Sequence, residues 1–254
     1  MANDAEIKSK TKDEGGILET VKVVVQALLI ALVLRTLLFQ PFNIPSGSLI
    51  PTLLIGDYLF VSKYTYGYSK HSMPFSPPLF QGRVWAAEPK RGDIAVFKLP
   101  SDGSTDYIKR VIGLPGDRIQ MIDGILHINN APVKRERIAD FVTTDAWGRS
   151  APVIQYRETL PNGVSHSIIE REGDTGTFDS TPVFTVPAGH FFMMGDNRDN
   201  SLDSRDRSVG YVPFENFVGR AEIIFFSIDE GASAWRIWEW PWTVRWNRMF
   251  STIK

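Results

Sequence analysis

Two serines in a short turn and one lysine in a predicted strand are the residues whose types and spacing could do chemistry. Ser46 and Ser48 flank Gly47 within residues 45–51, and a proline stands at each end of that segment. Proline fixes φ and removes an N–H donor, so neither a helix nor a central strand continues easily through this segment. Glycine lets the backbone turn between the two hydroxyls. The pattern predicts either a nucleophile that a substrate backbone can approach closely or a polar loop that leaves a helix.

A serine hydroxyl needs a base before it can attack an amide, and the usual base is histidine. The four histidines lie far apart in the sequence and outside any motif, at His71, His127, His166 and His190. Each is expected to be a surface or hydrogen-bonded histidine, and no pair has the spacing of a helical metal site. Serine can also pair with lysine, which directs attention to Lys109.

Lys109 lies in residues 106–113, an expected strand in which alternation places it on the same face as Tyr107 and Val111. If that face is buried, desolvation lowers the pKa of the amine and leaves it able to accept the serine proton. The sequence does not say which face is buried, so a solvated strand lysine remains the alternative.

A dense polar loop occupies residues 195–205, between two apolar segments. Its acidity is similar to that of an EF-hand loop, but it lacks the glycine and the terminal glutamate of such loops, so no metal is predicted. In the functional interpretation Ser201 hydrogen-bonds a base, while Asp203 and Arg205 pair to hold the loop. The alternative is a solvated loop.

The N-terminal region must position these groups. Residues 1–15 are polar and of mixed charge, which predicts a disordered tail. Residues 16–40 are apolar enough for a transmembrane anchor if Lys22 and Arg35 extend to opposite interfaces. No small-residue cleavage site follows, which favours an anchor over a removed signal peptide. An amphipathic or buried soluble helix is the alternative. Lysines before the span predict a cytoplasmic N-terminus and place residues 41–254 outside the cytoplasm.

The remainder of the chain has the pattern of a mainly β protein. Strands are expected at residues 58–64, 93–98, 106–113, 119–128, 190–194 and 218–227. Asp123-Gly124 predicts a tight hairpin within 119–128, and 67–92 is expected to be a long loop. Residues 131–185 are more polar and are predicted to form an inserted subdomain of short strands.

The C-terminal segment, residues 232–254, contains five tryptophans separated by arginines. This composition is typical of a membrane-interface belt. Packing of the segment over the β core is an equally open interpretation.

Composition limits the classes of function. The chain has 254 residues, a formal net charge of -1 and no cysteine. A nucleic-acid partner is not expected at this charge, and disulfides, thiolate nucleophiles and zinc–thiolate sites are excluded. The length allows one large domain or two small ones.

Three segments together resemble the motif boxes of bacterial type I signal peptidases. They are residues 46–53, residues 91–94 with 106–117, and residues 195–205, in that order after the apolar anchor. The resemblance implies a mainly β, antiparallel-sheet catalytic domain with an inserted β subdomain, preceded by one N-terminal transmembrane helix. It further implies a serine endopeptidase at the outer face of the bacterial inner membrane, which removes signal peptides from exported preproteins after small residues of the Ala-x-Ala type.

Site roles are carried over position by position. The resemblance implies that Ser48 is the nucleophile and Lys109 the general base, and that the Ser46 hydroxyl and Ser48 N–H form the oxyanion hole. It also implies that Ser201 orients the Lys109 amine, and that Asp203 and Arg205 brace the loop 195–205. The substrate would lie beside the site as an added strand. Shallow substrate pockets are implied at Phe42, Ile44, Pro45, Leu49, Leu53, Leu59, Val96, Tyr107 and Ile108.

Two other functions are compatible with parts of this sequence. A self-cleaving Ser–Lys regulator would need a cleavable linker and a DNA-binding domain, whereas residues 1–40 supply an apolar anchor. A membrane-tethered β-rich adaptor would bind exported chains without cutting them, and would not need reactive residue types at positions 48 and 109. The expected partners are secretory preproteins and membrane lipid, with no nucleic acid and no cofactor. The protein is expected to be a monomer.

Overall fold

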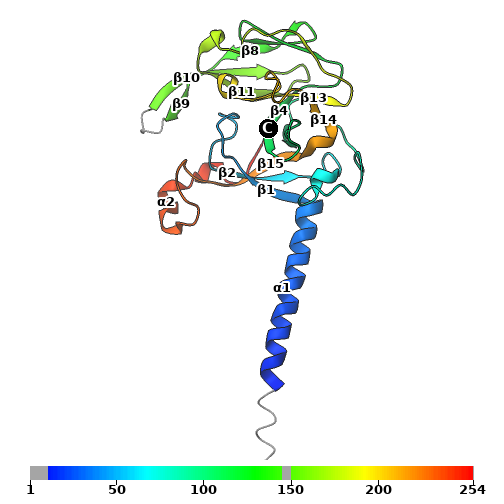
Figure 1. The fold of residues 1–254 in the computed structure, drawn as a ribbon. Coiled ribbons are helices and arrows are strands. Elements are labelled where there is room, and N and C mark those ends of the chain that lie inside the picture. Colours follow the sequence, from blue (N-terminus) through cyan, green and yellow to red (C-terminus); the bar gives the residue numbers. More distant parts are fainter. Residues whose placement is uncertain (1–10, 145–149, 254) are drawn as a thin grey trace, which may run out of the picture.

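The computed structural model describes residues 11–144 and 150–253. Helix α1 (Thr11–Leu37) extends away from three antiparallel sheets, as Figure 1 shows. In the described part of the chain this is the one helix long and apolar enough to cross a membrane, and its apolar side chains are exposed rather than packed on the sheets.

The helix differs from the predicted tail and anchor at both ends. It begins at Thr11, inside the predicted disordered tail, while residues 1–10 lie outside the described residues. Helix formation does not require apolar side chains, so a helix can extend past the apolar window. It ends at Leu37, and Phe39 already belongs to a strand that pairs with Ser62. The predicted anchor of 16–40 therefore ends in the first strand of the main sheet.

The main sheet has eight strands in the order β1-β2-β15-β3-β4-β13-β14, with β16 added beside β15. Their bounds are β1 (Phe39–Asn43), β2 (Asp57–Ser62), β3 (Ile94–Lys98), β4 (Asp106–Gly113), β13 (His190–Met194), β14 (Val212–Pro213), β15 (Phe217–Ser227) and β16 (Ser251–Thr252). All these pairs are antiparallel. The predicted mainly β fold is confirmed, and so are the principal predicted strands.

Two four-stranded sheets complete the fold. One combines β5 (Arg118–Ile122), β6 (Ile125–Ile128), β7 (Ala131–Pro132) and β12 (Phe184–Thr185). The other combines β8 (Lys134–Arg137), β9 (Phe141–Thr144), β10 (Ser150–Thr159) and β11 (Ser165–Glu170). Asp123 and Gly124 both have positive φ, at 47° and 73°, and this is the conformation that a two-residue hairpin turn requires. The predicted β5–β6 hairpin is confirmed.

The predicted insert, residues 131–185, shares sheets with residues outside it. Its first strand, β7, pairs with β6, and its last strand, β12, pairs with β5. The sheet of β8 to β11 lies wholly within it. The ends of the segment are therefore built into a neighbouring sheet, while its middle forms a sheet of its own.

Short helices connect the strands. They are η1 (Lys70–Ser72), η2 (Gly173–Thr175), η3 (Arg198–Asn200), η4 (Phe214–Asn216), η5 (Ile237–Glu239), α2 (Trp240–Thr243) and η6 (Trp246–Arg248). Within the C-terminal segment, the Trp240 ring packs against Phe226 at 5.2 Å between centroids. The other tryptophans there are exposed, namely Trp235, Trp238, Trp242 and Trp246. The segment thus combines packing on the β core with an exposed aromatic surface.

Candidate active site

Ser48 and Lys109 meet in the folded chain although 61 positions separate them. Ser48 lies in the turn that follows β1, which we call the serine turn (residues 45–53), and Lys109 lies in β4. The Lys109 Nζ donates a hydrogen bond to Ser48 Oγ at 2.6 Å. Both residues are buried, with exposed fractions of 7% and 5%. A hydroxyl and an amine in direct contact and largely shielded from water are the two components that the sequence predicted.

The surroundings make the amine a weaker base than an exposed lysine. Burial lowers the pKa of Lys109 to about 8, although the carboxylates of Asp203 and Asp196 favour the charged form. The Tyr107 ring centroid lies 5.3 Å from Nζ, and Val111 on the same face is fully buried, as are Arg110 and Ile112 on the opposite face. With this pKa, about a tenth of the amine is neutral at pH 7, and the fraction rises steeply above that pH. Such a lysine can accept a proton under ordinary conditions.

Asn197 holds the serine turn in place. Its backbone N–H donates to the Ser48 carbonyl at 3.0 Å, and its side-chain amide donates to the Gly47 carbonyl at 2.9 Å. Asn197 is fully buried. Asn197 was not among the predicted site residues. Its place after a Gly-Asp pair at the end of an apolar strand is the signal that could have identified it.

Gly195 allows the polar loop to approach the serine turn. A Cβ at this position would lie 2.5 Å from the Ser48 carbonyl oxygen and 2.2 Å from Ser201 Oγ. Real Cβ atoms do not approach other heavy atoms so closely, so glycine is required here by space. The segment 195–205 therefore lies directly against the backbone of Ser48.

A buried ion pair anchors the same region. The Arg110 guanidinium donates to both carboxylate oxygens of Asp196, at 2.8 Å each. Burial would raise the pKa of Asp196, but Arg110 holds it well below its usual range. Thr52, in the serine turn, also donates to Asp196, at 2.6 Å. Because Arg110 points to Asp196, strand alternation leaves Lys109 facing the serine. Arg110 and Asp196 were not among the predicted site residues.

The predicted loop pair is present. Arg205 donates to Asp203 through Nε and Nη2, at 2.9 Å each, and Asp203 also accepts the Gly195 N–H at 2.9 Å. Ser201 is buried, and no hydrogen bond joins its hydroxyl to Lys109 among the described residues; the hydroxyl instead helps to lower the pKa of Asp203. Its role in orienting the amine remains a prediction.

The predicted substrate pockets are unevenly exposed. Five of the residues are buried in one core cluster, namely Ile44, Leu49, Leu53, Leu59 and Val96, and Phe42 and Ile108 pack against it. Pro45 is exposed, and Tyr107 is half-buried beside the amine. Ser46, the predicted oxyanion donor, is also exposed.

No histidine takes part in this arrangement within the described residues. The buried His166 ring lies between two acids, with Nδ1 3.4 Å from Asp196 and Nε2 3.5 Å from Glu158. Glu158 itself pairs with Arg198, whose guanidinium donates to both of its oxygens. The polar core behind the serine turn is therefore a network of paired charges.

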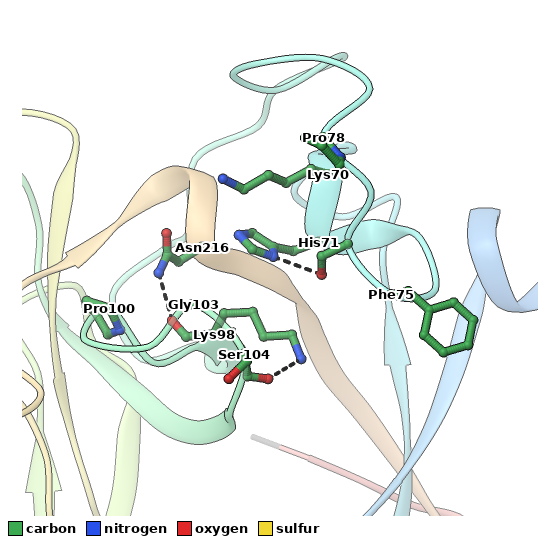
Figure 2. Close-up of a pocket in the computed structure, with 10 residues that line it drawn as sticks. Lys70, His71, Phe75, Pro78, Lys98, Pro100, Gly103, Ser104 and Asn216 are labelled. Carbon is green, nitrogen blue, oxygen red and sulfur yellow. Dashed lines mark hydrogen bonds between the residues drawn. The ribbon is translucent and has the colours of Figure 1, made fainter.

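A separate cavity of about 650 Å³ does not include the serine or the lysine. Figure 2 shows its polar lining, which includes Lys70, Lys98 and Asn216. Lys70 pairs with Glu215 at 3.1 Å, and Lys98 pairs with Asp106 at 2.9 Å. These amines already have carboxylate partners, so neither is available as a base. The lining also holds His71, whose Nδ1 lies 3.1 Å from Ser76 Oγ.

An antiparallel β scaffold that brings a serine hydroxyl to a buried amine has the arrangement that hydrolysis through a nucleophilic serine requires. Residues 17–226 match the family described as "Signal peptidase, peptidase S26". The chain belongs to this peptidase family.

Individual relatives agree with this assignment. Signal peptidase I of Rickettsia typhi is 47% identical over 205 residues, which cover 78% of this chain and 76% of the relative. Signal peptidase I of Rickettsia conorii is 42% identical over 240 residues, covering 88% of each chain. A solved structure of a signal peptidase I from Enterococcus faecalis V583 is 25% identical in sequence, with a TM-score of 0.30. The match covers 53% of this chain and 97% of the solved chain. Family membership follows from the sequence matches alone.

Proposed function

We propose that this protein is a membrane-anchored serine endopeptidase that removes N-terminal signal peptides from exported preproteins. The observation that carries the proposal is the 2.6 Å contact between Ser48 Oγ and the buried amine of Lys109. Membership of the signal peptidase family supports the choice of substrate. A membrane-tethered adaptor that binds exported chains without cutting them would not need this contact.

The proposed reaction begins with Lys109 in its neutral form. The amine accepts the proton of the Ser48 hydroxyl, and Oγ attacks the carbonyl carbon of the scissile bond. The Ser46 hydroxyl and the Ser48 N–H donate to the oxyanion that develops. The protonated amine then gives its proton to the departing amino group. Water, deprotonated by the same amine, hydrolyses the acyl-serine and restores the enzyme.

The edge of β4 provides a place for the substrate backbone. β13 pairs only with residues 110–113 of β4, whereas residues 106–109 have β3 on one side and no described strand on the other. An extended substrate can add as a strand at such an edge. It would then run past Lys109 with its side chains toward the apolar pockets predicted from the sequence. Limited room there favours the small residues of an Ala-x-Ala sequence.

The proposed topology follows from the two exposed apolar regions. Residues 16–40 would contain the membrane span, with the N-terminus cytoplasmic and 41–254 forming the extracytoplasmic catalytic domain of the inner membrane. The exposed tryptophans of 232–254 support contact with lipid, because α2 lies at the end of the domain from which α1 departs (Figure 1). We propose a monomer that acts without a cofactor.

Cleavage of a preprotein by protein reconstituted in lipid vesicles tests the proposal. Ser48→Ala and Lys109→Met are each expected to abolish nearly all turnover while leaving the tryptophan fluorescence of the folded state unchanged. A folded variant of either kind that cleaves at the wild-type rate would show that this pair is not catalytic.

A further inference from the structure

Three carboxylates converge beside the polar loop, apart from the serine–lysine pair. Glu170 ends β11, Asp179 follows η2, and Asp199 lies in η3. One oxygen of each lies within 4.8 Å of the others. Glu170 is fully buried and Asp179 is 2% exposed. Buried acidic groups in contact with one another demand an explanation, since like charges repel and burial disfavours ionisation.

Most oxygens of the cluster lack a hydrogen bond. Both carboxylate oxygens of Glu170, and Oδ1 of Asp179, accept no hydrogen bond from the described residues. The bonds that do form position the carboxylates: Asp179 accepts the Gly176 N–H at 2.6 Å, and Asp199 accepts two backbone N–H groups of residues 171–172. A buried carboxylate without partners is costly unless a cation or a proton compensates it. Glu170 therefore lies beside the other two acids, and both of its oxygens are available to bind a cation.

The neighbouring arginines, Arg198 and Arg205, bind other carboxylates and form no hydrogen bond with the cluster. Arg198 is paired with Glu158, and Arg205 is paired with Asp203. The remaining nitrogen of Arg205, Nη1, makes no hydrogen bond with the described residues, so it does not bind the cluster directly. A bound positive charge would compensate all three carboxylates.

Gly176 leaves room at the point where the oxygens meet. Its φ is -68°, which any residue can adopt, so the backbone does not require glycine here. A Cβ at Gly176 would lie 2.4 Å from Asp199 Oδ1 and 3.2 Å from Asp179 Oδ2. The glycine is needed for space among the carboxylates.

We propose that Glu170, Asp179 and Asp199 form a binding site for a divalent cation, and that calcium fits it best. The three side chains offer oxygen ligands only, which hard cations prefer. Oxygens within 4.8 Å of one another can surround a single ion at the calcium–oxygen distance of about 2.3–2.6 Å. Magnesium retains several waters, and the burial of two of the ligands leaves little space for them. The EF-hand comparison missed this site because only Asp199 belongs to the loop 195–205.

The bound ion would brace the loop that supports the nucleophile. It would join the end of β11, the turn around Asp179 and η3, which directly precedes Ser201. A backbone hydrogen bond from Ile169 N–H to the Asp196 carbonyl, at 2.9 Å, already links β11 to this loop. The site is therefore a structural one, and its occupancy can be measured without any cleavage assay.

Binding and thermal unfolding of the full-length protein in detergent micelles test the proposal. After treatment with a chelator, the wild-type protein is expected to bind one calcium ion per chain in a calorimetric titration. Calcium at about 100 times its Kd is expected to raise Tm by about 5 °C or more, and magnesium by less. Glu170→Gln and Asp179→Asn are expected to lose both effects. Glu172→Gln is the matched control, because it removes one exposed acid from the same turn, and it should behave as wild type.

Gly176→Ala provides a second test of calcium binding, which is needed if a carboxylate variant does not fold. This change preserves every charge and is expected to abolish calcium binding, with the Tm in chelator remaining near that of wild type. Wild-type protein that melts identically in calcium and in chelator would overturn the proposal. Equal loss of binding in Glu172→Gln would also overturn it, since the ion would then be attracted by surface charge alone.

Discussion

Two buried lysines in this molecule have similar environments and different partners. Lys63 and Lys109 are 1% and 5% exposed, and burial lowers the pKa of each to about 8. The Lys63 amine donates to the backbone carbonyl of Ser72 at 2.5 Å, whereas the Lys109 amine contacts the hydroxyl of Ser48 at 2.6 Å. The two sites thus differ in the group that faces the nitrogen.

The comparison shows that a lowered pKa does not by itself make a lysine a catalytic base. A carbonyl oxygen has no proton to give, so Lys63 can only satisfy a buried acceptor. A hydroxyl can transfer its proton to a neutral amine and become a nucleophile. Burial prepares both amines, and the partner decides which of them can do chemistry.

The largest expected difference between the two lysines is in cleavage. Lys109→Met should reduce kcat by about 10³-fold or more, because the serine loses its base. Lys63→Met should cleave a preprotein within a few-fold of the wild-type rate. Turnover of a vesicle-bound preprotein measures both, with thermal unfolding as the check that each variant is folded. If both variants are folded and lose kcat to a similar extent, the partner of the amine does not decide which lysine is catalytic.

The pH profile should follow Lys109 alone. Only the neutral amine accepts the serine proton, so kcat should rise with pH and level off above the pKa of about 8. At pH 6 the rate should be about a hundredth of the plateau. Lys63→Met should show the same midpoint as wild type. A rate that is constant from acid to alkaline pH would contradict the assignment of the base.

The position of the Ser48 hydroxyl, which distinguishes the Lys109 site from the Lys63 site, is expected to depend on Asn197. Asn197→Ala removes the amide that donates to the Gly47 carbonyl, and should lower kcat about tenfold because the serine is held less firmly. Asn200→Ala is the control, since Asn200 is exposed in the same loop. Rates are measured at a pH above 8, so that the charge state of Lys109 does not limit them. Equal rates for the two variants would show that Asn197 does not position the nucleophile.

The smallest expected difference is in stability. A lysine whose pKa is 10.5 when unfolded and about 8 when folded destabilises the fold as pH falls from above 10.5 through 8, and the penalty is complete below that. Lys109→Met should therefore be about 1–3 kcal/mol more stable than wild type at pH 7. Lys63→Met should gain less, since it leaves the Ser72 carbonyl unpaired.

Urea unfolding at pH 7 and at pH 10.5 measures this difference. The gain of the Lys109 variant should shrink at the higher pH, where the folded amine is neutral and about half of the unfolded amine is neutral too. A Lys109 variant that is less stable than wild type at pH 7 would mean that the amine contributes more through its contacts than its burial costs.

Local patterns were sufficient for much of the fold. The β5–β6 hairpin followed from Asp123-Gly124, because adjacent residues alone decide whether such a turn can form. The strand around Lys109 followed from its aromatic and β-branched residues, Tyr107, Ile108, Val111 and Ile112. The limits of α1 were less well predicted, since apolar composition defines where a membrane can lie and not where helical hydrogen bonding begins or stops.

The sequence by itself determined the residue types of the site, their order along the chain and the apolar segment that precedes them. Only the tertiary structure decided that Lys109 contacts Ser48, that Arg110 is bound by Asp196, and that Asn197 secures the serine turn. These contacts join residues far apart in the chain. Their distances depend on strand order and on which face of each strand is covered, and alternation within a single strand specifies neither.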